Sequence, residues 1–440
     1  MKHRCARSFD VSPLFVCALT GLVPAADLRV EVEAGRHPRR DTPVFIDLAA
    51  PAARAALVET TGGREKAVPA QVDGPRVHWI LQGETKPGSS RQFRLALLDG
   101  PSDAGAAAGP LAIEDVSGKH LEVRLGGRSV LRYNYGLVPP PEPGINPLHA
   151  RNGYLHPLWS PAGLPLTMDY PRNHLHHRGV WSPWVKTEFE GRDPDFWNLG
   201  DGKGRVEFEA LEGKQSGPVF AGFKARHRHV DLKAPGGPKA VLIERWSARV
   251  WRMGSGSLSI DGPAAEQGAT ERGATERAAG DRASYFLFDL DIDHECAGSS
   301  PLKLPQYRYG GLGIRGSWDW EGDNVRVFTS EGKGRLNAEG ANARWFDLSG
   351  PVGGPVNGKW AGIAVLGHPE NFRAPQPVRS HPSEPFMNFA PVKAGDFEIA
   401  PGKPYRARYR FYLHDGVLHA DEAERLWIDY AEPPVVRLKS

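Results

Sequence analysis

Cysteine is scarce in this sequence, and so are methionine and long hydrophobic runs. The 440 residues include 3 cysteines and 4 methionines. Cys5 and Cys17 lie close to the N-terminus, so a chain that lost this end would keep only Cys296 and could form no internal disulfide. Its stability must then come from buried cores, which a chain of this length can supply.

An excess of charge of one sign is also lacking. The sequence has 55 Lys and Arg residues against 52 Asp and Glu residues, for a formal net charge of +3. A balance this even gives no reason to expect nucleic acid or an anionic membrane surface as a partner. No apolar run beyond the N-terminus is long enough to span a bilayer, so we also expect no membrane insertion.

The N-terminus has the three regions of a secretory signal. A basic region precedes a short apolar run at 11–23, and small residues at 24–26 offer a cleavage site. The apolar run is too short to span a bilayer comfortably. We therefore expect residues 1–26 to be a signal peptide, a mature chain that begins near Asp27, and a secreted or periplasmic protein. The alternative is an uncleaved N-terminal tail.

Short runs of alternating polar and apolar residues recur along the chain, whereas long amphipathic helical patterns are scarce. Alternation is typical of strands with one solvated face, because successive side chains point to opposite faces of a sheet. Turns rich in Gly and Pro separate these runs. Many strands and few helices predict an all-β protein built from antiparallel sandwiches. The clearest runs are 28–32, 77–81, 121–125, 206–209 and 405–412.

The composition also divides the chain into domains. Residues 27–110 have a strand pattern of their own and predict a small N-terminal β domain, which ends in a low-complexity linker at 100–110. Residues 111–435 predict a large antiparallel β-sandwich, and the candidate site described below falls in this part.

Two further segments have distinct patterns. Residues 261–282 repeat Gly-Ala-Thr-Glu-Arg and contain almost no bulky apolar side chain, so we expect a flexible surface insertion. A short helix is expected near 420–430. The residues that would share its apolar face are Ala423, Leu426, Trp427 and Tyr430.

Residues 170–184 are rich in His, Arg and Trp, which carry ring nitrogens, guanidinium groups and flat aromatic faces. Asp195-Phe-Trp197 follows shortly after. No helical or strand period assigns these residues to a core. Such a set suits a polar, ring-shaped ligand, because Trp packs on C–H faces while His, Arg and Asp bind hydroxyl groups. The segment therefore predicts a carbohydrate-type site.

The site residues divide into those expected to do chemistry and those expected to bind. His176 or His177 would act as general acid or base, since imidazole titrates near neutral pH, and Asp195 would be its partner. For each residue the alternative is a structural role, such as a salt bridge from Arg178 to Asp169 or Asp195, or a core position for a Trp. The residues expected to bind the substrate are His174, Arg178, Trp181, Trp197, Arg315 and His368.

A metal is the alternative ligand for the histidine cluster. The spacing of His174 and His176 puts two imidazoles on one face of a strand. His227 and His229 repeat the spacing, although flanking arginines disfavour a cation there. A metal needs three or more well-placed ligands, and no HExxH motif or carboxylate-rich loop supplies them. We expect neither a metal nor another cofactor.

The glycines at 311–316 match the G-x-G-x-x-G pattern of dinucleotide-binding proteins. No amphipathic helix follows them and no βαβ unit surrounds them, so we do not expect a dinucleotide. We expect these glycines to let a strand bend or approach another group closely.

With these residues in hand, the chain resembles the bacterial PmoA-like family over nearly all of its mature length. The resemblance implies a β-sandwich of the galactose-mutarotase or supersandwich type, and carbohydrate chemistry by analogy. Where the family often has His-Gly after the Trp, this chain has Ser182-Pro-Trp184. The matching stretches are 171–181, 195–197, 309–315, 362–371 and 409–416.

Three functions fit these observations. The first is a secreted enzyme that acts on a sugar or glycoside by His/Asp acid–base chemistry, as an epimerase, hydrolase or lyase. The second is a non-catalytic glycan-binding protein, and the third is a metal-dependent lyase or oxygenase. A pocket that joins His176, His177 and Asp195 would favour an enzyme, whereas an open surface lined by Trp would favour binding alone.

Overall fold

A computed structural model gives the structure of residues 26–49, 52–98, 110–253, 285–354 and 358–439. All but the last residue of the expected signal peptide and of the expected linker, and the whole of the expected insertion at 261–282, lie outside these residues. The fold is all-β, as the sequence predicts, and it is built from antiparallel sheets. Within the described ranges, no helix has the length and apolar character needed to cross a membrane.

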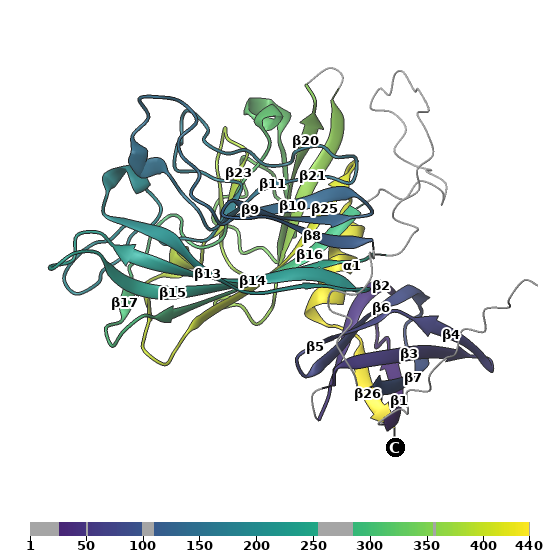
Figure 1. Cartoon of the computed structure of the whole chain (residues 1–440). Coiled ribbons are helices and arrows are strands. Elements are labelled where there is room, and N and C mark those ends of the chain that lie inside the picture. The colour runs from purple at the N-terminus through teal and green to yellow at the C-terminus, as the bar shows by residue number, and fades with distance from the viewer. Residues whose placement is uncertain (1–25, 50–51, 99–109, 254–284, 355–357, 440) are drawn as a thin grey trace, which may run out of the picture.

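A small two-sheet sandwich forms from the first seven strands and the last one (Figure 1). One sheet has the order β26-β1-β7-β3-β4 and the other the order β2-β6-β5. Trp79, Phe93 and Leu95 are among the side chains that fill the space between them. The strands are β1 (Ala26–Glu33), β2 (Arg39–Asp47), β3 (Arg54–Thr61), β4 (Arg64–Val68), β5 (Ala70–Asp73), β6 (Arg76–Thr85), β7 (Ser90–Leu98) and β26 (Val435–Lys439).

The C-terminal strand is a feature that the sequence did not signal. β26 pairs antiparallel with β1, with Val436 opposite Val32, and Val436 packs against the core of the small sandwich. The chain therefore ends in the sheet in which its first described strand lies. The expected domain limits at 110 and 435 stay a prediction.

The large sandwich has two eight-stranded sheets. The first has the order β22-β23-β18-β12-β11-β10-β9-β8 and the second the order β13-β14-β15-β16-β25-β21-β20-β19. Strands of the first sheet are β8 (Leu111–Val116), β9 (His120–Leu125), β10 (Arg128–Asn134), β11 (Tyr154–Leu158), β12 (Val180–Trp181), β18 (Gly313–Arg315), β22 (Val378–Ser380) and β23 (Phe386–Phe389). Strands of the second are β13 (Gly204–Ser216), β14 (Phe220–Asp231), β15 (Lys239–Trp251), β16 (Tyr285–Cys296), β19 (Arg326–Thr329), β20 (Trp345–Val352), β21 (Lys359–Gly367) and β25 (Tyr405–Asp415).

Smaller elements complete the fold. β17 (Leu302–Leu304) and β24 (Phe397–Ile399) form a two-stranded sheet. The helix α1 (Ala420–Ala431) lies where the sequence predicts one. The short 3-10 helices are η1 (Pro147–His149), η2 (Leu199–Asp201), η4 (Trp318–Trp320), η5 (Gly322–Asn324) and η6 (Pro391–Ala394).

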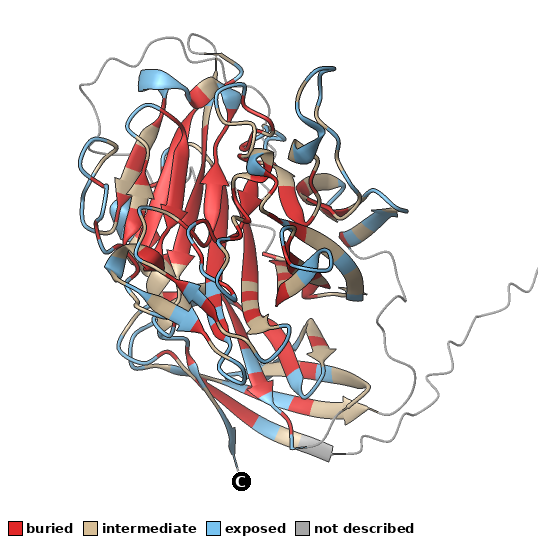
Figure 2. Ribbon diagram, turned by 90° about the vertical axis from the view of Figure 1, so that its left-hand side faces the viewer, coloured by how far each residue is buried: buried red, intermediate tan, exposed pale blue. Residues whose placement is uncertain are grey.

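Strand β16 shows how alternation builds the large core. Phe288 and Ile292 point between the two sheets and join the main hydrophobic cluster. Leu287 points to the other face of the second sheet, where it joins a separate cluster. Asp289 lies on that face as well and accepts two hydrogen bonds from Arg410, of 2.6 and 2.9 Å. The buried strands of the large sandwich stand out in red in Figure 2.

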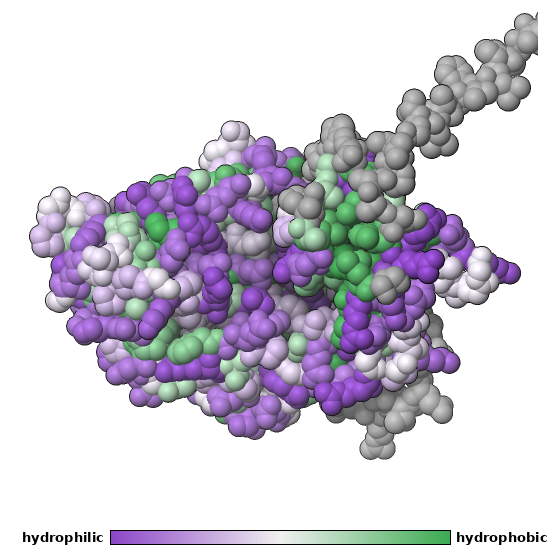
Figure 3. Space-filling view, turned by 90° about the horizontal axis from the view of Figure 1, so that it is seen from below, coloured by the Kyte–Doolittle hydropathy of each residue, from purple (hydrophilic) through white to green (hydrophobic). Residues whose placement is uncertain are grey.

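Helix α1 and the small sandwich cover the outer face of the second sheet. Ala423 and Leu426 of the helix are buried there, as the expected apolar face predicts. Ile80 of β6 and Phe220 of β14 belong to the same cluster. Seen from below, hydrophobic residues gather over the small sandwich, and hydrophilic residues cover most of the rest of this face (Figure 3).

We expect Leu426→Ala to lower the free energy of unfolding by about 2–5 kcal/mol, because it leaves a cavity between the helix and the second sheet. Leu426 is 4% exposed, whereas Leu438 of β26 is 49% exposed. Leu438→Ala is therefore the matched control and should change stability little. Urea unfolding of the two variants tests this. Equal losses of unfolding free energy would show that the packing of α1 does not depend on Leu426.

Candidate functional site

The candidate site forms on the outer face of the first sheet, where strands from distant parts of the sequence lie side by side. β12 pairs with β18, so that Trp181 lies opposite Gly313, and β18 pairs with β23, so that Arg315 lies opposite Phe386. The histidine-rich loop (residues 170–179) leads into β12, and Glu384 lies two residues before β23. Strand pairing thus gathers these loops in one place.

An aromatic cluster forms the floor of the site. Trp181, Trp197 and Phe386 pack together there with Tyr154. A Cβ atom on Gly313 would lie 2.9 Å from the Trp197 ring, which confirms the close approach expected of these glycines.

Trp181 and Trp197 are both 0% exposed, so in this structure neither offers a free face to a sugar. The half-buried Tyr309, whose ring centroid lies 5.1 Å from that of Trp197, is the ring at the edge of this floor.

Four imidazoles lie on this floor. His177 stacks on Phe386 with 4.7 Å between ring centroids, and His174 stacks on His177 at 4.8 Å. His176 lies 4.8 Å from His177, and His381 lies 5.8 Å from His174. Burial lowers the pKa of all four, to about 3 for His176 and well below the usual range for His177. All four rings are therefore neutral near pH 7.

Glu384 supplies the carboxylate of the site. Its oxygens accept hydrogen bonds from the guanidinium of Arg315 and the side-chain amide of Asn173. Its Oε2 atom lies 3.4 Å from Nδ1 of His174. The Arg315 side chain is 0% exposed and that of Glu384 is 9% exposed, so the pair is held within the protein beside a histidine that reaches the surface.

The sequence analysis missed Glu384 and His381. Both lie in the short loop between β22 and β23, which carries no recognisable motif. The only signal was a carboxylate two residues before a strand. It becomes informative only once that strand is known to pair with the strand of Arg315.

Arg178 acts on the backbone of the histidine-rich loop. It donates hydrogen bonds to the carbonyl oxygens of Leu175 at 2.6 Å and His177 at 3.0 Å, and also to that of His149. Its Nε atom lies 3.3 Å from Asp169, and its guanidinium packs over the ring of Tyr170. The salt bridge to Asp169, considered above as the structural alternative, is present.

Asp195 orders its own turn. It accepts hydrogen bonds from the backbone N–H groups of Trp197 at 2.8 Å and Asn198 at 2.9 Å, and from the side chain of Asn198 at 2.7 Å. Burial raises its pKa, although these bonds oppose the shift. Among the described residues, no hydrogen bond or ion pair joins Asp195 to a histidine, so the expected pairing with His176 or His177 is not formed here.

His368 lies in a different place from the histidine cluster. Its ring packs edge-on against Tyr430 with 5.0 Å between centroids. It lines a cavity of about 170 Å³ beside α1, together with Trp427 and Arg344. Of the expected site residues, the structure therefore brings together those of the histidine-rich loop, Trp181, Trp197 and Arg315, and leaves His368 outside.

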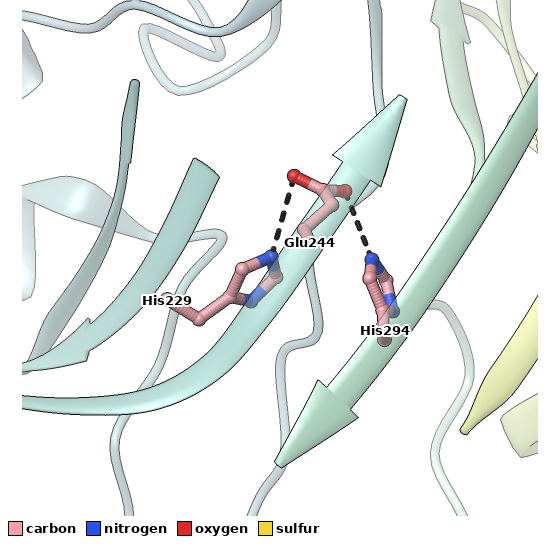
Figure 4. A group of neighbouring side chains, drawn as sticks. All are labelled: His229, Glu244 and His294. Atoms are coloured by element: carbon pink, nitrogen blue, oxygen red, sulfur yellow. Dashed lines mark hydrogen bonds and ion pairs between the residues drawn. The ribbon is translucent and has the colours of Figure 1, made fainter. Parts of the chain in front are cut away.

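A second polar cluster lies inside the large sandwich (Figure 4). His229, Glu244 and His294 come from the neighbouring strands β14, β15 and β16. The carboxylate of Glu244 lies 2.9 Å from Nε2 of His294, 2.9 Å from Nδ1 of His227 and 3.5 Å from Nε2 of His229. Although burial acts to raise it, hydrogen bonds from these imidazoles hold the pKa of Glu244 well below its usual range.

The arginines that flank His227 and His229 do not reach this cluster. His227 and His229 are 0% exposed and face the core, whereas Arg226 and Arg228 alternate to the other face and pair with Glu209 and Glu207. The expectation that these arginines would disfavour a cation at the two histidines is therefore wrong, because successive side chains of a strand point in opposite directions.

Trp184 determines whether this cluster suits a metal. Its indole N–H donates a hydrogen bond of 3.0 Å to Nδ1 of His294, so the proton of that neutral imidazole is on Nε2, toward Glu244. A protonated ring nitrogen has no lone pair for a metal. His229, Glu244 and His294 place ligand-type atoms within 4.8 Å of one another, but we interpret them as a hydrogen-bonded network.

The chain belongs to a family of unknown function, DUF6807, whose model matches residues 120–428. No curated protein matches the chain. The solved structure of an alpha-mannosidase from Enterococcus faecalis V583 is similar over 95% of this chain and 46% of its own, with a TM-score of 0.39 and 8% sequence identity. The chain thus spans about half the length of that protein, and a likeness this weak supports no conclusion about activity.

Arg178→Lys should destabilise the protein by about 2–4 kcal/mol, because one ammonium group cannot replace a fork that bonds three carbonyl oxygens. Arg172, whose side chain is 87% exposed, is the matched control in the same loop. Arg172→Lys should change stability by less than about 0.5 kcal/mol. Thermal unfolding of both variants checks this. An unchanged melting temperature for Arg178→Lys would show that Arg178 does not have this structural role.

The buried histidines should make the protein sensitive to acid. Burial lowers the pKa of His78 and His176 to about 3 and that of His156 and His229 to about 4, against 6.5 for an exposed imidazole. Between these values the unfolded chain binds more protons than the folded protein, so stability falls as the pH drops below about 6.5. Asp291, with a pKa raised to about 6, opposes this, as do Asp195 and Asp429, whose pKa values burial also raises.

We therefore expect the melting temperature to fall steadily from about pH 7 to about pH 5, each such histidine contributing up to about 1.4 kcal/mol per pH unit. Calorimetry at constant ionic strength measures this. A melting temperature that is constant or rises over this range would show that these imidazoles are protonated in the folded protein.

Proposed function

We propose that this chain is a secreted or periplasmic enzyme that acts on a sugar or glycoside by acid–base chemistry at the histidine cluster. The observation that carries the proposal is the pair formed by His174 and Glu384 at the accessible rim of the buried imidazoles. The His174 side chain is 30% exposed, whereas His177 beneath it is 5% exposed. His174 is thus placed to meet a substrate, and His177 to support it.

The carboxylate beside His174 favours its role as the base. The carboxylate of Glu384, 3.4 Å from Nδ1, favours a proton on that nitrogen and leaves the lone pair of Nε2 free. Arg315 and Asn173 hold the carboxylate in place. When Nε2 takes a proton from the substrate, Glu384 would stabilise the imidazolium that forms.

His381 has the opposite tautomer and would act as the acid. Its Nδ1 atom accepts hydrogen bonds from the backbone N–H groups of Glu384 at 3.1 Å and Ser383 at 3.4 Å. The proton of the neutral ring is therefore on Nε2. His174 and His381 would thus offer one lone pair and one N–H group, which is what mutarotation, hydrolysis or elimination at a sugar ring needs.

The composition of the site supports a sugar as the substrate. Asn173 and Glu384, which lie beside His174, carry donor and acceptor atoms of the kind that bind hydroxyl groups, and Tyr309 adds an aromatic ring at the edge. The expected resemblance to the PmoA-like family points to the same class of ligand by analogy only.

Glu384→Gln should lower kcat/KM at least about 100-fold on any sugar that the protein turns over, because the carboxamide cannot stabilise an imidazolium. Asp195→Asn is the comparison, since both changes replace a buried carboxylate with its amide. It should lower the melting temperature and leave most of the activity of the folded protein. Products from a panel of monosaccharides and oligosaccharides, with and without a chelator, are read by mass spectrometry and NMR.

The reverse result, with activity lost in Asp195→Asn and kept in Glu384→Gln, would return the catalytic role to Asp195. Binding of a sugar by the panel assay without any product would identify a glycan-binding protein. Loss of activity with chelator alone would favour metal-dependent chemistry.

A further inference from the structure

We propose that a second binding site lies beside α1, and that it takes a small uncharged molecule with one apolar ring and an oxygen atom that accepts a hydrogen bond. The site is the cavity of about 170 Å³ that His368 lines. None of the described residues that line it belongs to the histidine cluster, so the inference goes beyond the proposed function and does not depend on it.

Parts of the fold that are distant in sequence meet around this cavity. Arg344 directly precedes β20, and His368 directly follows β21. Phe389 ends β23 of the first sheet, and Trp427 comes from α1. The indole N–H of Trp427 donates a hydrogen bond of 3.0 Å to the carbonyl oxygen of Gly367, which fixes the ring beside the cavity. The walls are therefore held in place by the fold itself, as they are in most small-molecule sites.

Most of the lining is apolar. Phe389 and Trp427 contribute aromatic rings, Pro369 and Pro375 contribute aliphatic rings, and Ala374 contributes a methyl group. An apolar cavity of about 150 Å³ is large enough to hold a benzene molecule. The volume of this cavity therefore suits a single six-membered ring with a short substituent.

The lining offers no unpaired charge to a ligand. Among the described residues, Arg344 is the only charged one in the lining, and its Nη1 atom lies 2.9 Å from the carboxylate of Glu424. The same guanidinium packs over the ring of Trp427, 4.8 Å from its centroid. Burial lowers the pKa of His368, so its ring is neutral near pH 7. A charged ligand would lose its hydration here without gaining a counter-ion, so an uncharged one is favoured.

The two amide side chains of the lining already use their oxygen atoms within the protein. Oδ1 of Asn371 accepts a hydrogen bond of 2.8 Å from the backbone N–H of Arg408. Oε1 of Gln376 accepts one of 2.9 Å from the hydroxyl of Tyr409. The side chains of the lining are thus better supplied with donors than with free acceptors.

His368 supplies a free donor. Its Nδ1 atom accepts a hydrogen bond of 3.2 Å from the backbone N–H of Glu370, so the proton of the neutral ring is on Nε2. Among the described residues, nothing accepts a hydrogen bond from this Nε2–H group. A carbonyl or ether oxygen on the ligand provides that acceptor. A sugar would instead bring several O–H donors for which these side chains have no free acceptor.

Acetophenone is the probe for the test, because it combines one aromatic ring with a carbonyl oxygen and has no charge. Its binding to the full chain is measured by ligand-observed NMR titration. Wild-type protein should bind it at least about tenfold more tightly than benzoate, which has the same ring but carries a charge. D-Glucose at the same concentration should not displace it.

Two variants place the probe in the cavity. Ala374→Leu fills part of the space and should weaken acetophenone binding at least about tenfold. Ala210→Leu, the same change at another half-buried alanine, in β13, is the matched control and should leave binding unchanged. His368→Leu removes the donor, so it should lower the affinity for acetophenone relative to that for toluene about three- to tenfold.

A wild-type protein that does not bind acetophenone, or binding that survives in Ala374→Leu, would overturn the inference. Tighter binding of benzoate, or displacement by glucose, would overturn the choice of an uncharged ring. An unchanged ratio of the two affinities in His368→Leu would show that His368 is not the donor. If Ala374→Leu does not fold, Gly367→Ala replaces it, because a Cβ atom at Gly367 would meet the Phe389 ring at 3.7 Å, without a clash.

Discussion

The buried carboxylate of Glu244 is the interaction on which the large sandwich depends. It lies in the middle of the second sheet, and the imidazoles of His227 and His294 on the neighbouring strands turn toward it. The first sheet and the residues that follow it supply the next partners of these two imidazoles. The hydroxyl of Tyr133 lies 2.5 Å from His227, and the indole of Trp184 donates a hydrogen bond to His294. A charge is tolerated in a core only when donors surround it, so this network fixes the separation and register of the two sheets.

Trp184 also connects this network to the candidate site. It follows β12, the strand into which the histidine-rich loop leads, and its indole is anchored in the core through His294. Arg178 fixes the same loop from the other side by bonding three of its neighbouring carbonyl oxygens. The loop is thus held at both ends by charged or hydrogen-bonded groups, which gives the imidazoles fixed positions although they lie outside regular strands.

The sequence predicted the class of fold because alternation is a local property. The strand runs at 28–32 and 405–412 and the helix at 420–430 are confirmed, since each depends only on neighbouring residues. It could not predict Glu384 or the partners of Glu244, because these contacts follow from which strands pair across long stretches of chain. For the same reason, Asp195, placed near the site by its position next to Trp197, bonds only its own turn among the described residues.

The site therefore combines two kinds of histidine that the sequence shows as one cluster. His177 stacks on an aromatic floor and is held neutral by burial, so it can shape the site but exchanges protons poorly near pH 7. His174 and His381 lie closer to solvent, and each has one nitrogen fixed by a carboxylate or by backbone N–H groups. Burial makes the cluster rigid, whereas the fixed tautomers of His174 and His381 decide which ring accepts a proton and which donates one. The fold buries these histidines to different depths. For this reason the cluster offers one proton acceptor and one proton donor at its rim.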